Sequence, residues 1–330
     1  MQAILAVTIP FFGLVLLGWV ASRLHWLPAS AIPGLNAYVL FFALPCLLFR
    51  FGSSLPFDRL ADPVQLAVYL GAALLIVALT IAVTLQRPGR SGVDLRDAGL
   101  GALVAAFPNA GFMGVPLLVA LLGEAAAGPV IGAIVVDLVV TSTICLALAQ
   151  SHTHLAGVED RTLVQAAALS LRGALTNPLP WAIAIGAVFA ATGRELPAPI
   201  AQIVRMLGDS ATPVALFTIG AVLWRAGEHV HTRTPLGRTL PVALIKLLVH
   251  PALVFALGSA ARALGAPLSS FTLMVLTLTA ALPSASNVSV LAERYGADNG
   301  RIARIILVST ALAFVTFTAA AWLFGVGKDR

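Results

Sequence analysis

The chain has 330 residues, of which 59% are hydrophobic and only 10% are charged, and its mean hydropathy is +0.96. A soluble domain is about 45–50% apolar and about 25% charged, so this composition excludes a water-soluble enzyme. It also excludes a disordered chain, which needs low hydrophobicity and high net charge. The formal net charge is +6, but the basic residues lie singly in short loops, so no nucleic-acid partner is expected.

Long apolar segments bounded by charge, proline or glycine predict an all-α integral membrane protein with ten transmembrane helices. About 20 residues span a bilayer, so ten helices take about 200 residues and leave about 130 for short loops. The first segment has no basic region before it, which predicts a retained helix and not a cleaved signal. The predicted spans are 2–21, 32–51, 65–85, 98–122, 128–149, 173–192, 200–224, 240–262, 268–292 and 303–325.

A polar connecting loop at 151–172 divides the spans into two sets of five, within residues 1–150 and 173–330. Lysine and arginine are more frequent in cytoplasmic loops of membrane proteins than in external ones. Twelve basic residues lie on the side of the connecting loop and six on the opposite side. This bias predicts a multi-pass protein of the inner (plasma) membrane with a cytoplasmic central loop and both termini outside.

The two halves resemble each other at nearly constant spacing. The matching pairs are Pro10–Pro178, Gly18–Gly186, Pro45–Pro213 and Phe49–Phe217 at an offset of 168, and Pro108–Pro283 at an offset of 175. Because each half has an odd number of spans, the second half must enter the membrane in the opposite orientation. Two such inverted five-helix repeats are typical of secondary transporters.

The fourth and ninth predicted spans contain residues that interrupt a helix. Proline removes a backbone donor and glycine weakens the helix, so both spans are predicted to break. The helix-breaking residues are Pro108, Pro116 and Pro283, and the small or polar residues beside them are Asn109, Gly111, Ser284, Ser286 and Asn287. A helix that restarts within the membrane offers N–H groups and the positive end of its dipole. We therefore expect these five neighbours to bind an anionic group. The alternative is that each proline only kinks a packed helix.

Ionisable side chains within membrane spans are costly and are therefore functional candidates. Asp137, Asp209, Lys246 and His250 are the candidates for coupling transport to protons or other ions. Arg205 precedes Asp209 by one helical turn, which allows an ion pair within that helix. The alternatives are that Lys246 extends its ammonium group to the membrane surface and that His250 is a hydrogen-bonded structural residue.

The remaining motifs indicate no further chemistry. His152 and His154 lie in a polar loop without convergent cysteine or carboxylate ligands, so no metal site is predicted. The chain has no zinc-protease, serine-hydrolase or nucleotide-binding motif. We therefore expect no enzymatic activity, and no cofactor other than a coupling H⁺ or Na⁺ ion.

Four segments resemble the auxin efflux carrier family, and the resemblance extends over the whole chain. They are LPCLLF at 44–49, PNAGFMGVPLL at 108–118, ATPVALFTIGAVL at 211–223 and LPSASNVSVLAERYG at 282–296. The family includes plant auxin exporters and bacterial carriers of malonate, malate and related acids. The long cytoplasmic loop of the plant exporters is absent here, so regulation through such a loop is not expected.

The resemblance implies a fold like that of bile-acid/sodium symporters and some sodium/proton antiporters. Helices one, two, six and seven would form a scaffold, and helices three to five and eight to ten a moving transport domain. The broken fourth and ninth helices would cross. Asn109 and Asn287 match the family's crossover asparagines, near the substrate carboxylate, and Pro108 and Pro283 match its crossover prolines.

The expected function is secondary active transport of a small organic anion across the lipid bilayer by elevator-type alternating access. The anion would be a mono- or dicarboxylate, either auxin-like or malonate- and malate-like. By analogy, the scaffold would allow a homodimer. Two alternatives stay open: a membrane sensor or regulatory subunit that binds an anion without carrying it, and a passive organic-anion channel.

Overall fold

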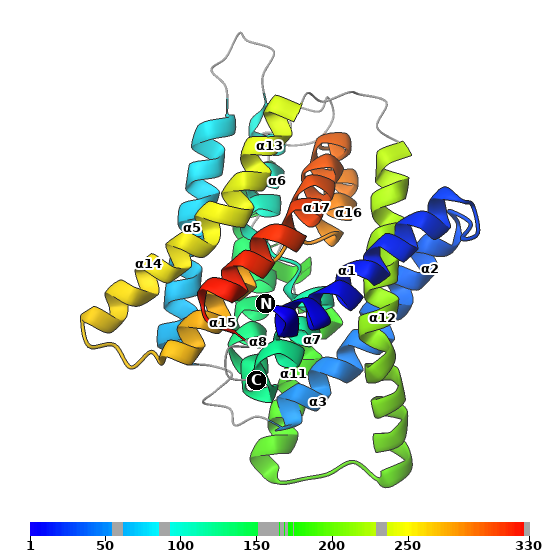
Figure 1. The fold of residues 1–330 in the computed structure, drawn as a ribbon, viewed down its shortest axis with the longest axis vertical. Helices are drawn as coiled ribbons and strands as arrows, with labels where there is room; N and C mark the ends of the chain where they lie inside the picture. Colours follow the sequence, from blue (N-terminus) through cyan, green and yellow to red (C-terminus); the bar gives the residue numbers. More distant parts are fainter. Residues whose placement is uncertain are drawn as a thin grey trace.

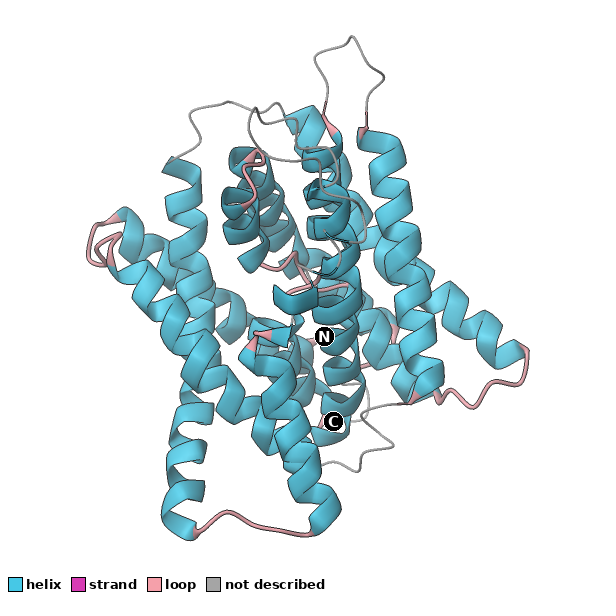
Figure 2. Ribbon diagram, turned by 180° about the vertical axis from the view of Figure 1, so that it is seen from behind, coloured by secondary structure: helices cyan, strands magenta, loops and turns pink. Residues whose placement is uncertain are grey.

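The computed structural model describes residues 1–54, 62–85, 93–150, 165, 168, 171–173, 175–228 and 236–326. These residues form helices joined by loops and contain no β-strand (Figure 2). Most of the predicted connecting loop at 151–172, with His152 and His154, lies outside the described residues.

In the first half of the chain, several short helical segments follow one another directly and together form longer helices. Its elements are α1 (Gln2–Arg23), α2 (Ala31–Tyr38), η1 (Val39–Ala43), α3 (Leu44–Ser54), α5 (Pro63–Thr84), α6 (Leu95–Ala106), η2 (Ala110–Gly114), α7 (Val115–Leu122), η3 (Glu124–Ala126), α8 (Ala127–Val136), η4 (Asp137–Thr141) and α9 (Ser142–Gln150). η1, η2 and η4 are π-helical turns, and η3 is a 3₁₀ turn.

The second half is built in the same way. Its elements are α11 (Pro178–Thr192), α12 (Ala198–Glu228), α13 (Leu236–Leu244), the π-helical turn η5 (Ile245–Val249), α14 (His250–Ala263), α15 (Ser270–Ala280), α16 (Asn287–Arg294) and α17 (Asn299–Leu323).

Seven helices in the described part of the chain are long and apolar enough to cross a membrane. The protein is therefore a multi-pass membrane protein. The other three predicted spans fall on shorter apolar helices, which cover Ala110–Leu122, Pro178–Thr192 and Ser270–Ala280. Two of these three are halves of the interrupted fourth and ninth spans.

Local chemistry explains where several helices begin and end. Asp62 precedes Pro63, and its carboxylate accepts hydrogen bonds from the next backbone N–H groups of α5. Asn177 caps α11 in the same way, before Pro178. Such caps satisfy N–H groups that have no partner within the helix, and proline fits the first turn because it has no N–H. Gly193 ends α11 in a left-handed conformation, with φ 62°.

Two pairs of helices cross in backbone contact at glycine. A Cβ atom on Gly18 of α1 would overlap a backbone carbonyl of α12, and one on Gly220 of α12 would overlap a backbone carbonyl of α1. Gly52 of α3 and Gly186 of α11 meet in the same way, with Cβ positions 2.8 and 2.5 Å from carbonyl oxygens of the partner helix. Small residues allow such close approach between membrane helices, where packing drives association.

The remaining helices form a second group. α5 packs against α6, α8 and α14, α6 packs against α9, and α14 packs against α15. Figure 1 shows α5 and α14 on one side of the molecule and α1, α2 and α12 on the other. α17 contacts helices of both groups, including α1, α12 and α13.

Polar contacts hold the start of α6 against the turn that follows α16. Arg96 Nη1 donates to the carbonyl oxygen of Gly296 at 3.1 Å, and the backbone N–H of Asp298 donates to Asp97 Oδ1 at 2.8 Å. Arg301 Nη1 also donates to the carbonyl oxygen of Asp97, at 3.1 Å. These bonds link the start of the fourth span to the end of the ninth.

Candidate functional site

Both interrupted spans leave the helix at the predicted prolines. α6 ends at Ala106, and Phe107 has an extended backbone with φ −96° and ψ 100°. The chain becomes helical again at Ala110. In the ninth span α15 ends at Ala280, and α16 begins at Asn287.

The prediction that Pro116 also breaks the fourth span is wrong. Pro116 lies in the first turn of α7, within a helical segment that continues from Ala110 to Leu122. Proline cannot donate to the preceding turn, and here that turn is the π-helical η2, so the missing bond falls where the α-helical bonding pattern already changes. The non-helical segment is therefore confined to the three residues around Pro108.

The two interruptions lie against each other, although they are 175 residues apart in the sequence. The backbone N–H of Asn109 donates to the carbonyl oxygen of Pro283 at 2.8 Å. The N–H of Ala285 donates to the carbonyl oxygen of Phe107 at 3.0 Å. Pro108 and Ser284 thus form an isolated antiparallel bridge. Each interruption supplies the backbone partners that the other has lost, as non-helical backbone within a membrane requires.

Several polar side chains at the interruptions have no hydrogen-bond partner among the residues that the structure describes. Asn109 and Ser284 are buried, with 3% and 1% of their surface exposed. Among the described residues, Asn109 Oδ1, Ser284 Oγ and Asn287 Oδ1 are buried oxygen atoms without a hydrogen bond. Buried polar groups are normally hydrogen-bonded, so such atoms indicate a place where a ligand or water completes the network.

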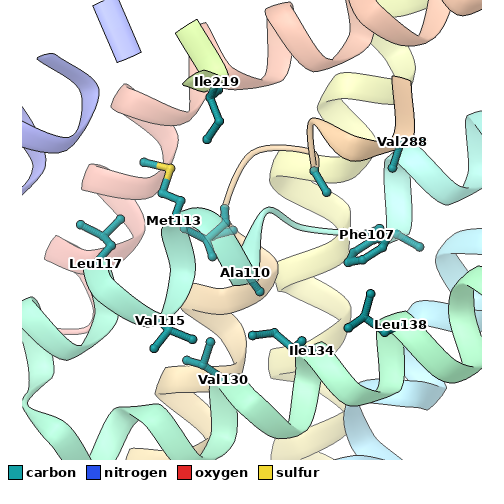
Figure 3. Packing of buried hydrophobic residues seen from close by; sticks show 14 of the residues in the cluster. Phe107, Ala110, Met113, Val115, Leu117, Val130, Ile134, Leu138, Ile219 and Val288 are labelled. Carbon is teal, nitrogen blue, oxygen red and sulfur yellow. The ribbon is translucent and has the colours of Figure 1, made fainter. Parts of the chain in front are cut away.

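A cavity of about 700 Å³ lies beside the interruptions. Ser286 and Asn287 contribute to its lining, as do the apolar side chains of Phe107, Phe112 and Leu138. Figure 3 shows Phe107 and Leu138 turned toward one another next to the first interruption. The cavity therefore has apolar walls and a polar edge where the ninth span is broken.

A smaller cavity of about 30 Å³ adjoins the large one and shares Phe107, Leu138 and Asn287 with it. Asn109 and Gly111 line this smaller cavity. Two of the predicted binding residues, Asn109 and Asn287, thus lie on the same small space, and Gly111 lies beside them. Ser284 lines neither cavity, and its backbone N–H donates to Ser309 Oγ of α17 at 3.2 Å.

Sequence reasoning missed several polar residues of the large cavity. Asn36 of α2, Ser142 of α9 and Asn177 line it, together with Arg225 and Arg294 at the ends of α12 and α16. Asn177 carries a recognisable signal, since asparagine before proline is typical of a helix N-cap. Its position on a cavity depends on helix packing and has no local signature.

Asp137, Lys246 and His250 come together in a second, fully buried polar cluster with Tyr69. Tyr69 Oη donates to Asp137 Oδ2 at 2.8 Å, and Thr141 Oγ1 donates to Asp137 Oδ1 at 3.1 Å. Tyr69 lies in a continuous apolar segment, so nothing in the local sequence predicted its role.

On the other side of this cluster, Lys246 Nζ donates to the carbonyl oxygen of Ala280 at 2.5 Å. The same nitrogen lies 3.4 Å from His250 Nδ1. The rings of His250 and Tyr69, with centroids 5.9 Å apart, join this pair to the carboxylate of Asp137. Lys246 is wholly buried, so the alternative in which its ammonium group reaches the membrane surface is wrong.

Asp209 lies apart from this cluster, and its predicted pairing with Arg205 is wrong. Asp209 Oδ1 accepts a hydrogen bond from Arg50 Nη1 of α3 at 2.6 Å, with 39% of the arginine side chain and 63% of the aspartate side chain exposed. The neighbouring α3 presents a guanidinium directly opposite Asp209, which outcompetes a partner on the same helix. The carbonyl oxygen of Arg205 also accepts a bond from Arg50, at 3.5 Å.

Comparison with known proteins gives a consistent set of relatives. A family model described as "Membrane transport protein" matches residues 3–321. The chain is 28% identical to the "Putative malonate transporter" of Rhizobium meliloti (strain 1021), over 99% of this chain and 98% of that protein. It is 24% identical to "Auxin efflux carrier component 8" of Arabidopsis thaliana, over 96% of each chain. It is 26% identical to an "Uncharacterized transporter" of Methanothermobacter thermautotrophicus, over 92% of each chain.

Proposed function

This chain belongs to the membrane transport protein family, the family of the auxin efflux carriers, and from this premise we propose that it is a secondary active transporter of small organic anions. It carries its substrate across the membrane and has no enzymatic activity. The substrate is a mono- or dicarboxylate. The names of the relatives, a malonate transporter and an auxin efflux carrier, support this class of substrate.

The observation that carries the proposal is the pair of asparagines at the interruptions. Asn109 and Asn287 line one small space, and neither side-chain amide is bonded to another of the described residues. Side-chain amides and the positive end of α16 attract a carboxylate without a buried fixed charge. The adjoining cavity of about 700 Å³ accommodates the rest of the anion against apolar walls.

We further propose that the chain is folded as two inverted five-helix repeats whose broken helices cross at this site. The glycine contacts support the repeat, because Gly18 and Gly186, and likewise Gly52 and Gly220, are each 168 residues apart. The hydrogen bonds between the two interruptions support the crossing. The backbone-packed group around α1, α3, α11 and α12 is the scaffold. The group around α5, α6, α14 and α15 moves against it in an elevator mechanism.

The side of the membrane on which the cavity opens follows from the predicted orientation of the chain. Arg225 and Arg294 line the cavity and lie at the ends of spans whose following loops are predicted to be cytoplasmic. The cavity then opens to the cytoplasm, with both termini outside. We also propose a homodimer through the scaffold, because the first half of α12 exposes Ile203, Met206 and Asp209.

Uptake into proteoliposomes tests the function. Malonate, malate and indole-acetate are supplied in turn, with and without an imposed pH or sodium gradient. We expect saturable, gradient-stimulated uptake of one of them. Asn109→Ala and Asn287→Ala should each raise KM about tenfold or more, because each removes a hydrogen bond to a charged group.

The control is Gly13→Ala in α1, where an added Cβ meets no atom within 4 Å, and its KM should not change. Unchanged KM in both asparagine variants would overturn the site. Specific binding without flux would favour the sensor or regulatory subunit. Unsaturable flux without accumulation would favour the passive channel.

A further inference from the structure

The start of α11 meets the two interruptions at the small cavity. Asn109 and Asn287 each stand at the start of a helical segment, and so does Asn177, which lines the same space of about 30 Å³. We propose that Asn177 is a third substrate-binding residue, whose side-chain amide donates a hydrogen bond to the substrate carboxylate from the scaffold. The inference deepens the proposed function and rests on it.

The N-cap bond fixes the direction in which the amide of Asn177 points. Asn177 Oδ1 accepts a hydrogen bond from the backbone N–H of Leu179 at 3.0 Å. Only the oxygen end of an amide accepts such a bond, so Nδ2 faces away from this N–H. Within the described part of the chain, no group accepts a hydrogen bond from Nδ2. The preceding turn is held as well, since Trp181 Nε1 donates to the carbonyl oxygen of Leu175 at 2.6 Å.

The first three residues of α11 offer no free backbone N–H to an anion. Pro178 and Pro180 have no N–H group, and the N–H of Leu179 is bonded to the cap. The positive end of the helix dipole nevertheless lies at this end of α11. A carboxylate beside these residues is therefore bound through the Asn177 amide, and the dipole adds a favourable potential.

The small cavity suits one carboxylate group. None of the described residues that line it is charged. A single water needs about 10–15 Å³, so a space of about 30 Å³ admits a group slightly larger than water. Asn109, with 3% of its surface exposed, and Asn287 each have a buried Oδ1 without a hydrogen bond among the described residues. Rotation of these two side chains exchanges their oxygen and nitrogen ends, whereas the cap holds Asn177 as a donor.

Asn177 reaches this cavity from the scaffold. Its helix, α11, crosses α3 in backbone contact at Gly186 and Gly52, whereas Asn109 and Asn287 belong to the interruptions. A carboxylate held by all three amides bridges the scaffold and the moving group. When the moving group slides, the carboxylate is separated from Asn177. The bond from Asn177 therefore exists only while the site faces the side on which the cavity opens, which is the cytoplasm in the proposed orientation.

Substitutions that preserve the cap separate binding from stability. Serine and aspartate cap helices as well as asparagine does, so Asn177→Ser and Asn177→Asp should unfold at the wild-type temperature in detergent. We would measure equilibrium binding of radiolabelled malonate, malate and indole-acetate to the purified protein. Asn177→Ser should raise the Kd of the bound anion about tenfold, because it removes an amide donor to a charged group. Asn177→Asp should raise it at least about tenfold more, because two negative charges then meet.

The matched control exchanges a cap elsewhere in the molecule. Asp62 caps α5 before Pro63 and lines neither cavity, so Asp62→Ser should leave Kd unchanged. A folded Asn177→Ser protein with the wild-type Kd, beside a raised Kd in Asn109→Ala, would overturn the inference and leave the proposed function intact. Specific binding of none of the three anions to the wild type would overturn both.

A second measurement compares the two sides of the membrane. KM is determined for the cytoplasmic side in inside-out vesicles and for the outer side in right-side-out vesicles. Asn177→Ser should raise KM about tenfold on the cytoplasmic side and less than about twofold on the outer side, whereas Asn109→Ala should raise it on both. An equal increase on both sides in Asn177→Ser would show that Asn177 moves with the site, and would overturn a contact made from the scaffold.

Discussion

At the scale of single residues, the neutrality of the proposed site is its main chemical feature. Asn109 and Asn287 bring amide groups, and not charges, to the space between the interruptions. An amide donates hydrogen bonds to an anion and is not trapped by a permanent counter-ion when the anion must leave. The arginines that line the larger cavity, Arg225 and Arg294, lie at the far ends of their helices.

Replacing Asn109 by aspartate tests this neutrality, because the side chain keeps its shape and gains a negative charge. We expect Asn109→Asp to raise KM at least about tenfold more than Asn109→Ala does, since two like charges then meet in a poorly solvated site. KM measured over a range of pH should recover as the pH falls and the new carboxylate is protonated. A KM equal to that of Asn109→Ala at every pH would contradict a bound anion next to this residue.

The location of Asp209 predicts that it does not take part in coupling. It is paired with Arg50 at a partly exposed position, outside the buried cluster around Asp137. We expect Asp209→Asn to change the initial rate of uptake by less than about twofold, because the Arg50–Asp209 pair lies outside both the cavity and the buried cluster. Asp137→Asn should abolish gradient-driven uptake, because it removes the carboxylate that Tyr69 and Thr141 hold. Equal losses in the two variants would contradict this assignment.

At the scale of helices, the π-helical turns mark the functional region. η1 and η4 contribute Leu40 and Leu138 to the large cavity, and η2 contributes Phe112. η5 carries Lys246. A π turn inserts one extra residue into a helix and rotates the side chains that follow, and such turns are frequent at functional sites.

The crossing of α1 and α12 gives a prediction on stability. An added methyl group at Gly18 or Gly220 overlaps a backbone carbonyl of the partner helix, which cannot move aside as a side chain does. We expect Gly18→Ala and Gly220→Ala each to destabilise the protein by about 1–3 kcal/mol, the usual cost of overpacking. Thermal unfolding in detergent would show this as a lower midpoint.

The matched control lies on the same helix. Gly13 of α1 has open space around its Cβ position, so Gly13→Ala should leave the midpoint unchanged or raise it slightly, because alanine favours a helix more than glycine does. If Gly18→Ala and Gly220→Ala unfold at the temperature of Gly13→Ala, the two helices do not cross in backbone contact.

At the scale of the whole molecule, the direction in which the cavity opens can be measured from either side of the membrane. Val290 of α16 lines the cavity and is 48% exposed, whereas Leu264, in the loop after α14, is 89% exposed. We expect Val290→Cys to react with a membrane-impermeant thiol reagent from the cytoplasmic side, and Leu264→Cys only from outside. Both variants need serine at the two native cysteines, Cys46 and Cys145.

Substrate provides the control for this labelling. A transported anion should slow the reaction of Val290→Cys, because it occupies the same cavity, and leave that of Leu264→Cys unchanged. Labelling of Val290→Cys from outside and of Leu264→Cys from inside would show that the chain is inserted in the opposite orientation.

By itself, the sequence determined the class of the molecule and the places where its spans are interrupted. The membrane class follows from the balance of apolar and charged residues, which needs no knowledge of contacts. The interruptions at Pro108 and Pro283 follow from the missing N–H of proline, a property of one residue and its neighbours. The same local rule wrongly predicted a break at Pro116. Whether a proline breaks a helix also depends on where the helix restarts, which one residue and its neighbours do not show.

Only the tertiary structure decided which distant groups meet. It paired Asp209 with Arg50 and not with Arg205, placed Tyr69 on Asp137, and brought Lys246 to the end of α15. These partners are between 34 and 159 residues apart along the chain. Their meeting depends on how whole helices pack and rotate, and at Asp137 and Lys246 on π turns that shift the register of the helix. Local sequence encodes where a helix breaks, and the packing of helices determines which side chains face one another.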